Sequence, residues 1–381
     1  MAKSVKKTVT KPKAMKVPAY VRHGMKSMKS RADRDNWCIN VEQILSLDEN
    51  DMTKRLIDDG YIPDLENTTC PKCGTGTLGA LRSARRGQLS HRCNKKACQQ
   101  YIVPHINHPI FTVGQGGNGV PLKRQAAVVL CILAGTSNVA TRRVLGTVNH
   151  KVIEKIRTSL HFHVKKYVLR KQKNMTFGDK KVWKDVEGDE TTVAKKTDPS
   201  CPSNACTDWE QYAGLIERGS PESLVLFKTS HSKTDARAPG PGAIRKTDWK
   251  PIADKYIKDR KVILHTDKAR SYKAKISGVL HDSVRHCKKR VKVKGKWVWK
   301  QPVYTKKWTH TTPNGQKIQV KAGTQIIDRA WRSIKSHLTG ISSAPGSSRL
   351  EAAVRYAQWV YWNRGKDLWK MLGEVLADSH K

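Results

Sequence analysis

The stretch KVILHTDKARSY, residues 261–272, begins with an apolar run of the kind that forms a buried central strand, and Asp267 closes that run. Upstream, WKDVEGDETT (residues 183–192) reads as another strand with Asp189 at its end. A helix is expected between the two, at about residues 248–257. Short strands joined through a helix predict an α/β domain with a mixed sheet.

A third acid lies downstream in GTQIIDRAWRSIKSHL, residues 323–338. Helical spacing predicts a buried stripe of Ile327, Trp331, Ile334 and Leu338. A neighbouring face would then carry Asp328 together with Arg332 and Lys335.

Asp189, Asp267 and Asp328 are therefore the candidate catalytic residues. Carboxylates at neighbouring strand ends can hold two Mg²⁺ or Mn²⁺ ions about 3.5–4 Å apart, which is the arrangement of two-metal nucleases. Taken singly, Asp189 and Asp267 are better explained as turn or cap residues and Asp328 as an ion-pair partner of Arg332, but taken together with the four cysteines described below they favour catalysis. Glu187 and Glu190 are expected only to support the site, and Glu351 is the alternative third acid.

The charge of the chain indicates the partner. The 381 residues contain 73 Lys and Arg but 32 Asp and Glu, a net charge of +41, which predicts a polyanion such as double-stranded DNA. The alternative is a basic ribosomal or chromatin-type protein without catalysis. Eleven tryptophans and a segmented apolar pattern argue for a folded protein.

Four cysteines form the spacing C-x2-C-x19-C-x4-C: Cys70, Cys73, Cys93 and Cys98. Two tight turns that each present two thiolates predict a structural Zn²⁺ site that closes a small β-ribbon. The arginines between the pairs are expected to contact phosphate; they are Arg82, Arg85, Arg86 and Arg92. Cys201 and Cys206 have no matching second pair, so no further metal site is expected there.

Residues 121–170 read as three helices with breaks at Gly135 and Gly146. The last two resemble a helix-turn-helix, with Thr136 as N-cap and an outer face of His150, Lys151, Lys155 and Arg157. A plain helical hairpin is the alternative. His161 and His163 are interpreted as ordinary helix residues.

Residues 288–322 are rich in Lys and Trp. From Lys268 to Lys307 there are 14 Lys and Arg residues and one acidic residue, a composition that favours DNA binding. The residues predicted to contact nucleic acid are Lys335, Arg332, Lys268, Arg270, Trp297, Trp299, Lys151 and Lys155.

The expected organisation is a basic flexible arm (1–35), a helical segment (36–65), the zinc ribbon (66–112), a helical DNA-binding segment (113–175), the α/β domain (180–365) and a C-terminal tail (366–381). No run of 18 apolar residues exists, so no membrane span is expected. The chain has nine cysteines, an odd count, and four of them are clustered, which fits a reducing compartment. The predicted location is the nucleus in a eukaryote and otherwise the cytoplasm or nucleoid, without secretion.

The order of these features resembles the DDE transposases of the Merlin and ISXO-like insertion-sequence group over about residues 66–365. Glu187, Asp189, Glu190 and Thr191 match that family's first motif, and Thr266, Asp267 and Tyr272 match its second. Trp331 and Lys335 match the helical third motif, and His286 matches a histidine that precedes it. The closing stretch YAQWVYWNR, residues 356–364, fits as well.

The resemblance implies an RNase H-like fold, two divalent metals, and cutting and joining of transposon DNA by a homo-oligomer. Two residues depart from the family pattern: Asp328 stands where the family has Glu, and Gln325 where it has Asn. The shorter acid raises an alternative, a transposase-derived DNA-binding protein that no longer cuts. A non-enzymatic zinc-ribbon nucleic-acid-binding protein is the third possibility.

Overall fold

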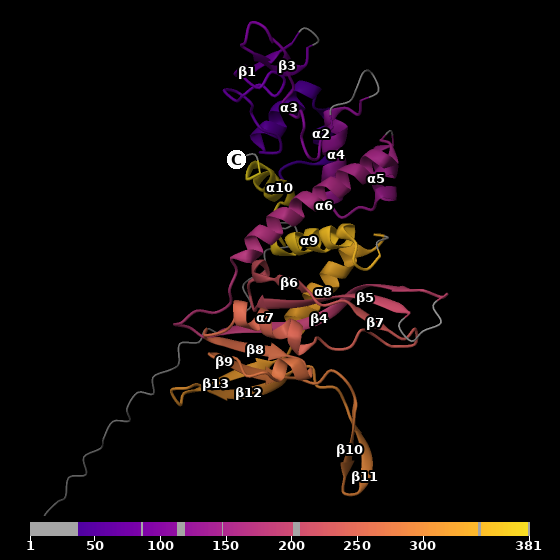
Figure 1. The fold of residues 1–381 in the computed structure, drawn as a ribbon, viewed down its shortest axis with the longest axis vertical. Helices are drawn as coiled ribbons and strands as arrows, with labels where there is room; N and C mark the ends of the chain where they lie inside the picture. Colours follow the sequence, from indigo (N-terminus) through magenta and orange to yellow (C-terminus); the bar gives the residue numbers. More distant parts are fainter. Residues whose placement is uncertain are drawn as a thin grey trace, which may run out of the picture.

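The computed structural model describes residues 37–84, 87–112, 119–146, 148–200, 206–341 and 344–379. Its elements form successive layers along the long axis of Figure 1: a small cysteine-bearing sheet, a layer of helices, a central sheet and a projecting hairpin. The predicted basic arm, Arg85, Arg86 and Cys201 lie outside the described residues. None of the described helices is long and apolar enough to cross a membrane.

The central sheet is mixed, as the sequence predicted. Its strand order is β6-β5-β4-β8-β9, with β7 paired to β5. Strand β5 pairs antiparallel with β4 and with β6, whereas β4 pairs parallel with β8 and β8 pairs parallel with β9. The strands are β4 (Lys184–Thr197), β5 (Thr207–Glu217), β6 (Val225–Lys228), β7 (Ser232–Thr234), β8 (Val262–Thr266) and β9 (Val279–Ser283).

Helices cover both faces of this sheet, because side chains alternate between the faces along each strand. Helix α7 (Lys246–Tyr256) packs against the face that carries Val186 and Leu264. Helix α8 (Gln325–Leu338) packs against the opposite face, where Gly214 leaves room for the ring of Trp331. The predicted buried stripe of α8 is confirmed for Ile327, Trp331 and Ile334, while Leu338 is half-buried.

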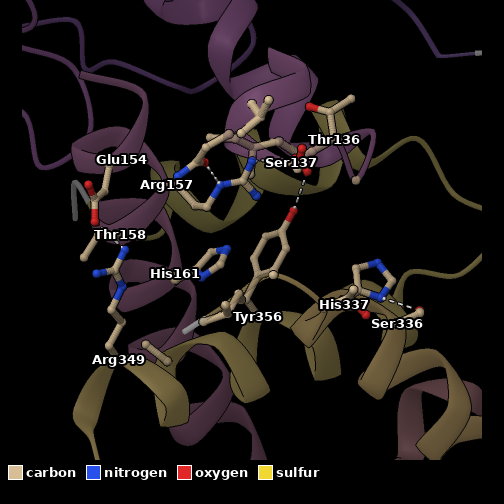
Figure 2. A pocket seen from close by; sticks show the side chains of 18 of the residues that line it. Thr136, Ser137, Glu154, Arg157, Thr158, His161, Ser336, His337, Arg349 and Tyr356 are labelled. Atoms are coloured by element: carbon tan, nitrogen blue, oxygen red, sulfur yellow. Dashed lines mark hydrogen bonds and ion pairs between the residues drawn. The ribbon is translucent and has the colours of Figure 1, made fainter. Parts of the chain in front are cut away.

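The remaining helices share one hydrophobic core with α8 and that face of the sheet. Helix α6 runs beside α9 along its length, and a cavity lies between them (Figure 2). Their bounds are α2 (Val41–Ser46), α3 (Glu49–Asp58), α4 (Leu122–Leu133), α5 (Asn138–Leu145), α6 (His150–Lys173), α9 (Ser348–Trp362) and α10 (Leu368–Ala377).

The prediction of a C-terminal tail from residue 366 is wrong, because α10 is a buried helix. Trp369 is completely buried and stacks on Tyr61 with ring centroids 4.2 Å apart. A Cβ at Gly373 would lie 1.9 Å from the carbonyl oxygen of Asp59, so only glycine permits this contact.

Two other local predictions were inaccurate. The segment 36–62 forms two helices instead of one, because Asp48 accepts from the first backbone N–H groups of α3 and starts a new helix there. The N-cap of α5 is Ser137, one residue after the predicted Thr136, which instead bonds to the carbonyl of Cys131.

Two hairpins follow β9. The hairpin β12 (Lys306–Thr311) and β13 (Lys317–Ala322) packs Ile318 and Val320 against Ile263 of the sheet. The other, β10 (Lys289–Val293) and β11 (Lys296–Lys300), projects away from the sheet in Figure 1, and almost all its residues are exposed.

Candidate active site

Asp189 and Asp267 are neighbours on one face of the sheet. The parallel pairing of β4 and β8 places Glu187 opposite His265. Asp189 and Asp267 each lie two residues beyond this last pair, at the carboxyl end of β8, and the charge of Asp267 acts on Asp189. Because two steps preserve the face, both aspartates lie on the side covered by α8.

The predicted position of Asp189 at a strand end is wrong. Strand β4 continues to Thr197 because β5 pairs with it as far as Thr207. Asp189 nevertheless lies beside the end of a strand, because β8, the other strand that pairs with β4, ends at Thr266. Its site is the carboxyl end of β8.

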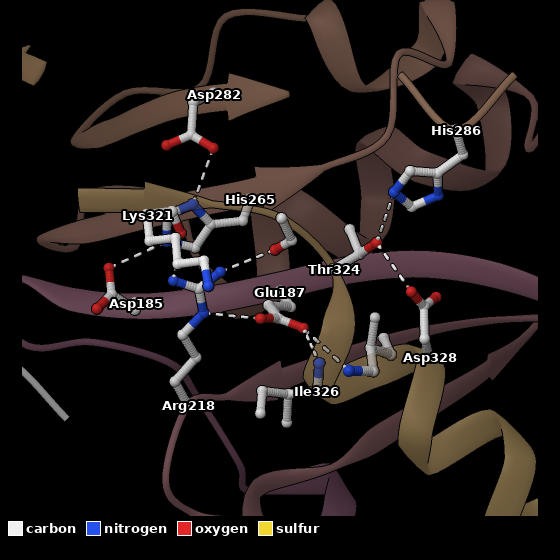
Figure 3. A network of polar contacts seen from close by, with 12 residues as sticks. Asp185, Glu187, Arg218, His265, Asp282, His286, Lys321, Thr324, Ile326 and Asp328 are labelled. Carbon is white, nitrogen blue, oxygen red and sulfur yellow. Dashed lines mark hydrogen bonds and ion pairs between the residues drawn. The ribbon is translucent and has the colours of Figure 1, made fainter. Parts of the chain in front are cut away.

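Helix α8 brings the third acid to the pair. The indole Nε1 of Trp331 donates to Asp189 Oδ2 over 3.1 Å, and Asp328 lies one turn earlier on the helix. Asp328 accepts from the Thr324 hydroxyl, which also lies 3.3 Å from His286 Nε2, so the histidine joins the site (Figure 3).

The three carboxylates are close enough to affect one another. Burial first, and then the charges of Glu190, Asp328 and Asp267, raise the pKa of Asp189 to about 8. Burial also raises the pKa of Asp328. A concentration of carboxylates that oppose ionisation is the environment that a divalent cation would neutralise.

The carboxylate oxygens do not converge on a single point. Within the described part of the chain, the four cysteines are the one group of three or more potential ligands whose atoms all lie within 4.8 Å of each other.

Glu187 has a role that the sequence did not reveal. It lies on the same face as Asp189, where the sequence predicted only a supporting residue. Its carboxylate accepts from the backbone N–H groups of Ile326 and Ile327 at the start of α8, over 2.7 and 3.0 Å, and from Arg218 Nε over 2.7 Å (Figure 3). It therefore fixes the helix that carries Asp328 to the strand that carries Asp189.

Glu190 points to the other face. It accepts from the Tyr272 hydroxyl and from the backbone N–H of Ile244. Glu351, the alternative third acid, pairs with Lys165 over 2.6 Å and is not among the charges that act on Asp189. The geometry thus favours Asp328.

A buried chain of acids and histidines supports β8 and was also missed. His265 lies between Asp185 (3.0 Å) and Asp282 (2.8 Å), and the other oxygen of Asp282 is 2.9 Å from His310 Nε2. Burial alone would lower the pKa of His265, but the two carboxylate hydrogen bonds outweigh it and raise the pKa. The hydrogen bonds from His265 and His310 overcome the burial of Asp282 and hold its pKa at about 2.

The residues predicted to contact nucleic acid fall into three groups. Lys268, Arg270, Arg332 and Lys335 are exposed around the three aspartates. Trp297 and Trp299 are 58% and 59% exposed on the projecting hairpin, where Arg290 lies over the Trp297 ring.

Lys151 and Lys155 form the third group, on the exposed side of α6 in the helical layer. The predicted outward position of Arg157 is wrong, because its guanidinium turns inward to Asn138 and to the carbonyl of Thr136.

The four cysteines lie together beside the sheet of β1 (Leu78–Ser83), β2 (Leu89–Cys93) and β3 (Tyr101–Ile102). The Sγ atoms of Cys73 and Cys93 are 3.8 Å apart, and those of Cys70 and Cys98 are 4.0 Å apart. A Cβ at Gly76 would meet the Cys93 sulfur at 2.4 Å, so the turn needs glycine. This cluster could hold a metal ion such as zinc.

No family model, curated protein or solved structure matches this chain. The functional conclusion therefore rests on the geometry and charge of the sites themselves.

Proposed function

We propose that this chain is a DNA transposase of the DDD type, which cleaves transposon ends with Mg²⁺ or Mn²⁺ and joins the 3′-OH to target DNA. One observation carries the proposal: the charges of Asp267, which follows β8, and of Asp328, on α8, both act on Asp189 of β4, within a chain of net charge +41. Acids grouped in a strongly cationic chain serve metal-dependent phosphate chemistry better than solubility.

The sheet supports an RNase H-like domain. Three antiparallel strands come first in the chain and two parallel strands follow, in the spatial order third, second, first, fourth, fifth. This is the arrangement by which RNase H-like domains are recognised. In such a domain the first and fourth strands lie side by side, so acids on them face one site.

Asp189, Asp267 and Asp328 would hold two metal ions. When bound, such ions lower the pKa of an attacking water and stabilise the leaving 3′ oxygen. Asp189 would give up its proton on binding, since its raised pKa leaves it mostly protonated at neutral pH. Arg332 and Lys335, exposed on the same helix as Asp328, would position the DNA phosphates.

The cysteine cluster would be a structural zinc ribbon, since four sulfurs leave no open position for substrate. Together with Lys151 and Lys155 and the projecting hairpin, it would give the DNA several separate contacts. Cutting and joining two ends also calls for a homo-oligomer on the DNA.

A second candidate is a transposase-derived DNA-binding protein that no longer cuts. The observation favouring it is that Asp328 is one methylene shorter than glutamate and that its oxygens do not converge with those of the other two acids. A non-enzymatic zinc-ribbon protein is disfavoured, because it gives no reason for Asp189 and Asp267 to be neighbours.

Incubation with supercoiled plasmid and with DNA carrying the inverted repeats that flank the gene, in Mn²⁺, tests the proposal. We expect nicking and end cleavage by the wild type, and none by Asp189→Asn or Asp267→Asn. The exposed Asp254→Asn is the matched control and should cut normally. If the wild type binds this DNA as tightly as Asp189→Asn and neither cuts it, the non-cutting candidate is correct.

A further inference from the structure

A cavity of about 780 Å³ lies away from the three aspartates, between α6, α9, the loop that precedes α5 and the C-terminal end of α8 (Figure 2). Its volume is within the range of about 300–1,000 Å³ that is typical of ligand pockets. The predicted helix-turn-helix forms one wall, and the helix that carries Asp328 contributes another. None of the proposed steps of DNA cleavage uses this cavity.

Arg157 is a half-buried cation that lines the cavity and has no carboxylate partner among the described residues. Its Nε donates to Asn138 Oδ1 over 2.6 Å and its Nη2 to the carbonyl of Thr136 over 2.5 Å. Burial lowers its pKa, and no carboxylate among the described residues lies within ion-pair distance of it. Its two protein acceptors are neutral, so this guanidinium at the cavity wall keeps its positive charge available to an anion that enters the cavity.

His161 is a second polar group that awaits a partner. The side chain lines the cavity and is only 6% exposed, and its Nε2 has no hydrogen-bond partner. Its ring stacks on that of Tyr356 at 4.3 Å, which fixes its orientation (Figure 2). Burial lowers its pKa to about 3, so the ring is neutral and offers one donor and one acceptor.

The rest of the lining adds aromatic surface and further positive potential. Phe162 and Tyr356 present rings, and Arg349 lies at the edge, paired with Glu154. Ser137 caps α5 at the cavity, so the positive end of that helix dipole adds to the field of Arg157. A simple inorganic anion would use the charge but leave the aromatic wall and His161 without contacts.

We propose that this cavity binds a phosphorylated nucleotide. The phosphate lies against Arg157 and the start of α5, and the base packs on the aromatic side of the cavity with its edge hydrogen-bonded to His161. Arg157 recognises the charge of the phosphate, and His161 recognises the base. The binding reaction requires no metal and no cleavage, so it stands independently of the proposed transposase activity.

Titration calorimetry of the intact protein with 2′-deoxyadenosine 5′-monophosphate tests the proposal, with inorganic phosphate and 2′-deoxyadenosine as its two halves. We expect the whole nucleotide to bind at least roughly tenfold more tightly than either half, because each half satisfies one of the two groups. The variants are Arg157→Gln and His161→Phe; the second keeps the ring stack on Tyr356 and so protects the fold. Arg143→Gln, which removes one exposed charge from α5, is the matched control.

Arg157→Gln should weaken nucleotide binding by roughly tenfold or more, which is the effect of losing a charge-assisted hydrogen bond. His161→Phe should abolish the preference for nucleotide over phosphate, and Arg143→Gln should change neither. Competition with a 5′-phosphorylated oligonucleotide identifies the natural ligand. If the oligonucleotide displaces the nucleotide, the ligand is the 5′ end of a DNA strand; if it does not, the ligand is a free nucleotide. The proposal is overturned if millimolar nucleotide does not bind, if phosphate binds equally well, or if Arg143→Gln weakens binding as much as Arg157→Gln.

Discussion

Replacing Asp189 with asparagine should make the metal-free protein more stable. The pKa of this carboxyl is raised from 3.8 to about 8 in the folded chain, by burial first and then by Glu190, Asp328 and Asp267. A carboxyl whose pKa is higher when folded than when unfolded reduces stability as the pH rises from the lower value toward the higher one. Each pH unit in this window removes about 1.4 kcal/mol.

The window between the unfolded pKa of 3.8 and pH 7 spans about three units, so ionisation in the unfolded state costs the fold about 4 kcal/mol at neutral pH. Asparagine has the same shape and no charge, and its amide oxygen can still accept from the Trp331 indole. We therefore expect Asp189→Asn to raise the free energy of unfolding by about 2–4 kcal/mol at pH 7. At pH 4 the gain should nearly vanish.

Urea unfolding followed by tryptophan fluorescence at pH 4, 5.5 and 7 measures this difference. The buffers should lack divalent metals without containing a chelator, which would also strip the cysteine cluster. Asp254→Asn, at an exposed site, should change stability by less than about 0.5 kcal/mol at every pH. Mg²⁺ should stabilise the wild type but not Asp189→Asn. A variant that is less stable than the wild type at pH 7, or a gain that does not grow with pH, would refute the reasoning.

Three further predictions concern other parts of the chain. Cys73→Ser should abolish stoichiometric zinc in the purified protein, measured by elemental analysis, and unfold the small sheet around it while the helical core remains folded. His265→Gln removes the histidine that lies between the buried carboxylates of Asp185 and Asp282, and should cost about 3–5 kcal/mol in urea unfolding at pH 6. Because the folded pKa of His265 is raised, that loss should shrink as the pH rises through it; an equal loss at pH 6 and pH 9 would count against an ionised histidine. The double variant Trp297→Ala with Trp299→Ala should weaken single-stranded DNA binding by about 1–3 kcal/mol per ring in fluorescence anisotropy, with an unchanged melting temperature because both rings are more than half exposed.

Local periodicity was sufficient to predict the elements nearest the site. Ile327, Trp331 and Ile334 follow the helical spacing of an amphipathic helix, and the observed α8 buries all three. Strand β8 begins with the apolar residues Val262, Ile263 and Leu264 because all of its side chains are buried, and it lies inside the sheet between β4 and β9. In both cases the residues that form the sequence pattern are the same neighbouring residues that become buried, so a local pattern was enough to predict the element.

The errors arose where distant segments decide the outcome. The length of β4 depends on its pairing with β5, so no local signal could show that Asp189 lies inside a strand. The partners of His265 are 80 and 17 residues away, and those contacts exist only once β4, β8 and β9 are assembled. Glu187 could have been assigned, since two-residue spacing from Asp189 already places both on one face.

The contact between α10 and the first helices has a consequence for the biosynthesis of this protein. Trp369 donates to Asp59 across 310 residues of sequence. At about 5–20 residues per second, a ribosome needs roughly 15–60 s to make that stretch. Until then, Tyr61 and its neighbours lack the surface that buries them. Nascent chains should therefore depend on chaperones for much of their synthesis, and chains that stop early should be recognised by proteases through this exposed aromatic surface.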